Sequence, residues 1–118
     1  VSLLKFLLAI DGNDKSFPDI ISRKSSLRLV EREGDYQPLG WKTIYPNGKW
    51  WRSGSLPGTS ALAVVRNDGF SYVFITNTSP WPGARFPYEI DRLLTRNIKM
   101  IEKWPDINLF YPIGLNVN

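Results

Sequence analysis

The side chains of this chain that could do chemistry are hydroxyls, carboxylates, amines and guanidinium groups, because its 118 residues include no Cys and no His. Without Cys there is no thiolate nucleophile and no disulfide framework. Without His, the commonest general base and the commonest metal ligand are missing. The composition therefore excludes Ser–His catalytic triads and the usual zinc sites, and we expect neither a metal ion nor a cofactor.

The charge of the chain is basic but spread out. Its 15 Lys and Arg residues exceed its 11 Asp and Glu residues by four, and basic and acidic residues interleave in both halves of the chain. A spread excess lacks the basic stripe that is typical of nucleic-acid-binding proteins, so we expect no nucleic-acid partner. The longest apolar run, Leu3 to Ile10, is interrupted by Lys5 and is about half as long as the roughly 20 residues that a membrane-spanning helix needs. We therefore expect no membrane span, and the compartment stays open.

The elements that must position any site begin with two short helices, which are predicted near the start of the chain. Leucines recur at helical spacing ahead of Gly12, which predicts a helix over residues 2–11. Ser22 is placed to cap a second helix that runs to Val30.

The middle of the chain has the period of two that is typical of strands. Asn47-Gly48 is a tight-turn pair and predicts a first hairpin that begins near Leu39. The turn residues 67–69 predict a second hairpin, which joins residues 60–66 to residues 70–77. Both strands of the second hairpin are apolar on both faces, as expected for strands that are covered by layers on either side.

A Pro- and Gly-rich stretch, residues 78–86, predicts a loop before the last helix. That helix is predicted from Pro87 to Trp104, with one apolar face and one charged face that we interpret as solvated, including a Glu89–Arg92 pair. The fold class is therefore α+β: an antiparallel sheet of about four strands, with short N-terminal helices and a long C-terminal helix.

The segment from Trp50 to Ser60 reads Trp-Trp-Arg-Ser-Gly-Ser-Leu-Pro-Gly-Thr-Ser. It resembles the C-terminal part of the serine β-lactamase-related hydrolases, the group that holds class C β-lactamases, D-alanyl-D-alanine carboxypeptidases and family VIII esterases. The resemblance implies that residues 1–118 are a single partial domain, the C-terminal segment of a β-lactamase/transpeptidase-like fold. Shorter stretches carry it as well: Leu3–Phe6, Asp11–Gly12, Pro18–Ser22, Gly40–Trp41, Asp68–Gly69, Phe74–Asn77 and Pro87–Asp91.

In that family the third motif, Lys/His-Thr/Ser-Gly, lies on the strand that forms one wall of the active site, and Arg52-Ser53-Gly54 stands at that place here. The resemblance implies that Arg52 holds a substrate carboxylate, that Ser53 hydrogen-bonds it and that Gly54 lets the backbone approach the acyl group. It also implies that the N–H of Ser55 is an oxyanion-hole donor. Arg departs from the family pattern, since a guanidinium is a poor proton shuttle. The alternative is that Arg52 is an edge-strand charge that discourages aggregation.

The other two motifs of the family, Ser-x-x-Lys and Tyr-x-Asn, occur here formally at Ser2 to Lys5 and at Tyr45 to Asn47. We reject both as catalytic, because the family places a whole helical domain between these motifs and Tyr45 lies almost beside the third motif. No residue of this chain is therefore assigned a catalytic role, and whether the chain is itself an enzyme stays open.

Two hypotheses follow. In the first, the chain is a segment of a serine hydrolase that, when complete, hydrolyses an amide, an ester or a β-lactam through an acyl-serine and binds a small carboxylate, ester or β-lactam. Its partner is then the N-terminal half of the same fold, or a second copy that pairs along residues 70–77. In the second, the chain is a catalytically inactive remnant that acts as a binding or interaction module.

Overall fold

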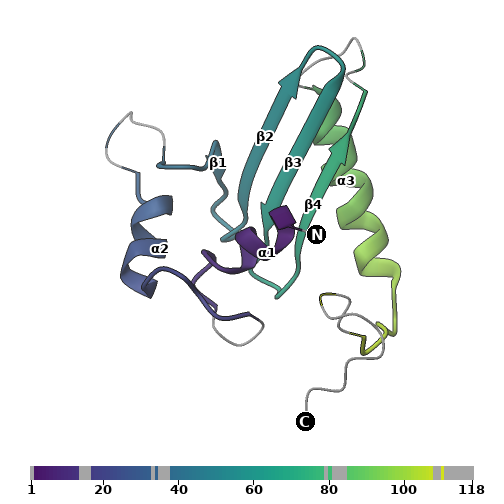
Figure 1. The fold of residues 1–118 in the computed structure, drawn as a ribbon. Coiled ribbons are helices and arrows are strands. Elements are labelled where there is room, and N and C mark those ends of the chain that lie inside the picture. Colours follow the sequence, from purple (N-terminus) through teal and green to yellow (C-terminus); the bar gives the residue numbers. More distant parts are fainter. Residues whose placement is uncertain are drawn as a thin grey trace.

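A computed structural model describes residues 2–13, 17–32, 34, 38–78, 80, 85–107 and 110. Within this part of the chain the α+β class is confirmed by three helices and four strands (Figure 1). In chain order the elements are α1 Ser2–Leu8, α2 Arg23–Val30, β1 Thr43–Ile44, β2 Trp50–Leu56, β3 Thr59–Val65, β4 Ser71–Thr76 and α3 Arg85–Met100.

The four strands form one antiparallel sheet in the order β1-β2-β3-β4. β2 pairs with β3 along its whole length, from Trp50 opposite Val65 to Leu56 opposite Thr59. β3 in turn pairs with β4. β1 faces only the first two residues of β2, so past Trp51 the outer edge of β2 has no neighbouring strand among the described residues.

Glycines form the two turns that the sequence predicted. Gly48 and Gly69 have φ angles of 79° and 88°, in the left-handed region that glycine adopts without strain. The two turns also lie against each other, because a Cβ built on Gly48 would come within 3.3 Å of the Cβ of Asn67. The β1–β2 and β3–β4 turns therefore meet at the same end of the sheet.

Each face of the sheet carries its own apolar cluster. Leu7 of α1 packs with Trp41 and Val65 on one face. On the other face Trp51, Leu62 and Val64 form a cluster against which Ile90 of α3 packs. The helices α1 and α3 thus lie on opposite faces of the sheet (Figure 1), and side chains that alternate along a strand reach different layers.

The helix boundaries partly follow the prediction. The Oγ of Ser22 accepts a hydrogen bond from the N–H of Ser25 at 3.1 Å, which confirms the predicted cap of α2. α1 ends at Leu8 and not at residue 11, because the carbonyl of Ala9 accepts the N–H of Ile20 at 2.8 Å and the chain turns back there.

The C-terminal helix is shorter than predicted. α3 ends at Met100 and does not reach Trp104, whose ring packs against Phe70 with 5.0 Å between centroids. That contact draws the chain away from the helical path. The helix also begins earlier, at Arg85, whose Nε lies 3.1 Å from the Oε1 of Glu89, one helical turn away. The predicted Glu89–Arg92 pair is wrong, because Glu89 pairs with Arg85 instead.

Two other expectations need correction. The first strand of the first hairpin is only Thr43–Ile44, because Trp41 turns into the cluster beside Leu7 instead of continuing the ladder.

Both strands of the second hairpin were expected to be covered on both faces. β3 is covered on both faces, but Ile75 of β4 is exposed, so the expectation is wrong for β4. Most of the loop predicted for residues 78–86 lies outside the described residues.

Candidate functional site

The four residues that the resemblance marks as substrate-binding lie in succession on β2. Arg52, Gly54 and Ser55 are exposed, and Ser53 is half-buried. Side chains alternate along a strand, so Arg52 lies on the α1 face, like Trp50. Ser53 lies on the α3 face, like the buried Trp51. Arg52 and Ser53 therefore reach one ligand together only if that ligand lies across the outer edge of β2.

The backbone amide groups of Ser53 and Ser55 point toward that outer edge. The carbonyl of Trp51 accepts the N–H of Lys42, on the β1 side, at 3.1 Å. In a strand the N–H and C=O of one residue point the same way, and the direction reverses at each step. Residues 53 and 55 therefore point to the same side as residue 51, and they do so beyond the end of β1.

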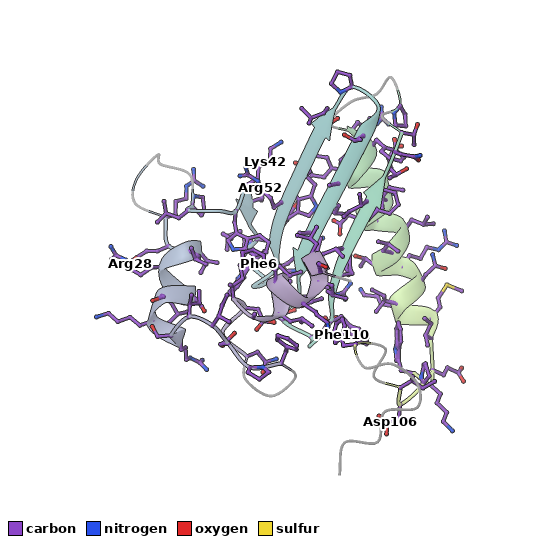
Figure 2. The ribbon with its side chains drawn as sticks, in the orientation of Figure 1. Phe6, Arg28, Lys42, Arg52, Asp106 and Phe110 are labelled. Carbon is purple, nitrogen blue, oxygen red and sulfur yellow. The ribbon has the colours of Figure 1, made fainter. Side chains whose placement is uncertain are left out.

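The open part of the β2 edge carries two cations. Figure 2 shows Arg52 and Lys42 beside β2 at this edge. The Nζ of Lys42 lies 5.8 Å from the centroid of the Trp51 ring. Neither side chain forms an ion pair within the described part of the chain. Cations that have no acidic partner among the described residues attract carboxylates, and the planar guanidinium of Arg52 can bind one with two parallel hydrogen bonds.

The two tryptophans before Arg52 hold this strand between both layers. Trp51 is 0% exposed and stacks on Tyr88 of α3, with ring centroids 4.5 Å apart and planes 13° apart. Trp50 packs edge to face on Trp41 with 5.6 Å between centroids. Aromatic contacts on both faces restrict rotation and sliding of β2, so the position of Arg52 on the edge is fixed by packing.

The Ser-x-x-Lys and Tyr-x-Asn patterns do not come together. In α1 the Nζ of Lys5 donates to the carbonyl of Phe110 at 3.5 Å and lies over the Phe110 ring, and Ser2 is exposed. Tyr45 packs in the cluster on the other face of the sheet. Burial, and then Tyr88 and Asp91, raise the pKa of Tyr45, which keeps its phenol protonated. The sheet separates the two patterns, so they form no Ser–Lys–Tyr site.

A buried polar cluster under α3 was not predicted. Asp91 is 5% exposed and accepts hydrogen bonds from the Nζ of Lys49 and the hydroxyl of Tyr72. The same hydroxyl lies 3.2 Å from the Oγ1 of Thr95. Burial and the hydrogen bond to Asp91 raise the pKa of Tyr72 well above its usual value. The sequence feature that could have predicted this cluster is the pair Asp91 and Thr95, two polar residues four positions apart on the otherwise apolar face of the last helix.

Among the described residues there is no group of three or more acidic side chains placed to hold a metal ion. No helix in the described ranges has the length and apolar character to cross a membrane. Comparison of the chain with models of protein families gives no match, and comparisons with curated proteins and with solved structures give none either. We therefore infer a function from the residues of β2 and their geometry.

Proposed function

We propose that this chain is the C-terminal segment of a β-lactamase-related serine hydrolase. It supplies the third-motif wall of a site at which the complete protein hydrolyses an amide, an ester or a β-lactam through an acyl-serine. The observation that carries the proposal is the place of Arg52 on the exposed edge of β2, next to the outward-pointing backbone of Ser53 and Ser55 and past the end of β1.

Each of these residues has a separate task in the proposal. Arg52 binds the carboxylate of the substrate by charge-assisted hydrogen bonds. Gly54 lies two residues further on the same face, and a Cβ built there would meet no atom within 4 Å, which leaves room for the acyl group. The N–H of Ser55 donates to the oxygen on which negative charge develops during acyl transfer. Ser53 contributes its hydroxyl to a carboxylate that lies across the strand edge.

The nucleophile and the general base belong to the N-terminal half of the fold in this proposal. β4 offers a place for that half, because its outer edge has no partner strand in the described part of the chain. An added strand would bond to the unpaired N–H and C=O groups of β4 and cover the exposed Ile75. A second copy of the chain is the other partner that fits the same edge.

The experiment that tests the proposal is acylation of the complete protein. The upstream coding sequence is expected to hold a further Ser-x-x-Lys, and a β-lactam or a fluorophosphonate is expected to label its serine, as seen by mass spectrometry of the digested protein. Absence of an upstream Ser-x-x-Lys, or absence of any labelled serine, would favour the second candidate, an inactive remnant. The presence of Arg where the family has Lys or His is the observation that favours that candidate.

A further inference from the structure

A second group of cations lies on the α3 side of the sheet, away from the face that carries Arg52. Arg92, Arg96 and Lys99 follow one another at helical spacing on α3, and all three are exposed. None of them forms an ion pair or a hydrogen bond with another described residue. Like charges three and four residues apart destabilise a helix. Lys99 lies in the last turn, where the helix dipole favours a cation, but the stability of α3 does not explain Arg92 and Arg96.

The stripe borders a groove that shares three lining residues, Lys49, Thr95 and Lys99, with a smaller hollow. The groove has a volume of about 790 Å³, and Lys49 and Asp91 belong to its wall. The hollow, of about 140 Å³, lies where the two hairpin turns meet α3. It has the volume of a few water molecules, each of which occupies roughly 30 Å³ in the liquid. Its lining contains three cations and no carboxylate: Asn47, Lys49, Arg66, Asn67, Thr95 and Lys99.

Both acidic residues of the groove wall, and Asp68 in the β3–β4 turn, are already paired. Asp91 binds Lys49, Asp68 binds Arg66, and Glu89 binds the Nε of Arg85 at 3.1 Å. Each of these pairs cancels one positive charge. The three cations of the α3 stripe are left over, so the groove and the hollow have a net positive charge that favours an anion.

Arg66, which lines the hollow, also has a buried donor with no acceptor among the described residues. The side chain of Arg66 is 8% exposed, and Asp68 accepts from its Nε and Nη2. Its Nη1 is buried and has no hydrogen-bond partner in the described part of the chain. Asn47 uses its Oδ1 to accept the N–H of Lys49 at 3.2 Å, which leaves its amide nitrogen as a further donor. An anion with several oxygens satisfies such a set of donors.

We propose that the hollow binds a phosphate group and that the groove along α3 holds the rest of a small diphosphate-bearing molecule. The three cations of α3 are spread over eight residues, about 10 Å along the helix, which fits more than one phosphate. Leu93 and Met100 are exposed at the groove and offer an apolar surface to an organic group. The site lies on the opposite face of the sheet from Arg52, so it does not depend on the proposed hydrolase function.

The test is calorimetric titration of the chain with pyrophosphate, and separately with ADP, at low ionic strength. We expect saturable 1:1 binding. R96Q/K99Q should weaken pyrophosphate binding about tenfold or more, equivalent to about 1.4 kcal/mol. The control R23Q/K24Q removes the same charge from exposed positions on α2 and should change the affinity less than about twofold, as expected for screened, distant charges. Far-UV circular dichroism checks that the variants fold.

Asn67→Leu separates a built site from diffuse charge attraction. It replaces the polar amide of a residue that lines the hollow by methyl groups of similar shape, without changing any charge. It should also weaken pyrophosphate binding about tenfold, which is again about 1.4 kcal/mol. Tighter binding of ADP than of pyrophosphate would identify a nucleotide-like ligand, and equal binding would identify the phosphates alone as the recognised group. Lack of saturable binding, equal losses in R96Q/K99Q and R23Q/K24Q, or an unchanged affinity in Asn67→Leu would each overturn the proposal.

Discussion

Replacement of Lys49 by Met tests whether the ion pair under α3 holds the helix on the sheet. The side chains of Lys49 and Asp91 are 17% and 8% exposed, so both are largely removed from water. Lys49→Met leaves the Asp91 carboxylate buried, with the Tyr72 hydroxyl as its only remaining side-chain donor among the described residues. Removal of one partner of a buried pair costs about 3–5 kcal/mol, compared with about 0–1 kcal/mol for an exposed pair.

The assay is urea unfolding of four proteins: the wild type, Lys49→Met, Asp91→Asn and the double variant. Each single variant is expected to lower the free energy of unfolding by about 3 kcal/mol or more, and the double variant by less than the sum. Asp91→Asn keeps a group that can bond to Tyr72, so the cycle isolates the charge interaction. A loss below about 1 kcal/mol in both single variants would show that the pair behaves as an exposed one, and the burial argument would then fail.

Three other outcomes are expected. Trp51→Ala removes a fully buried ring that stacks on Tyr88 and should lower the free energy of unfolding by about 3–5 kcal/mol in the same assay, while a loss under about 1 kcal/mol would contradict the role of this ring as an anchor of β2. At micromolar concentration the isolated chain should dimerise or aggregate through β4 in light scattering, and Ile75→Lys should reduce this association; a well-dispersed wild-type monomer would mean that the edge is covered. The isolated chain should hydrolyse neither a chromogenic β-lactam nor a nitrophenyl ester above background, and turnover that disappears in Ser2→Ala would restore the Ser2–Lys5 pair as a catalyst.

Local chemistry in the sequence was enough to predict the features that depend on neighbouring residues. The Ser22 cap needs only the hydroxyl and the N–H groups of the next turn, and the turn at Asn47-Gly48 needs only a residue that accepts a positive φ. The end of α3 was missed, because it depends on the packing of Trp104 on Phe70, residues that are far apart in the chain.

In the candidate site, too, features that depend on neighbouring residues could be predicted, and features that depend on distant residues could not. Alternation along a strand is enough to predict that Arg52 and Ser53 leave β2 on opposite faces. The opening of the β2 edge beyond Trp51 could not be predicted, because it depends on Trp41 leaving the ladder to pack beside Leu7. The Lys49–Asp91 pair joins residues 42 positions apart, and no local pattern relates them.

The most direct test of the proposed function is Arg52→Ala in the complete protein, measured with two substrates. A carboxylate-bearing chromogenic β-lactam should lose about 1.5–3 kcal/mol of binding, roughly 10- to 150-fold in affinity, because a charge-assisted hydrogen bond is removed. A neutral nitrophenyl ester should change little. Arg52→Lys keeps the charge and serves as the matched control, with a smaller loss for the β-lactam. Equal losses for both substrates would contradict the account, since Arg52 would then act on the structure of β2 and not on the carboxylate.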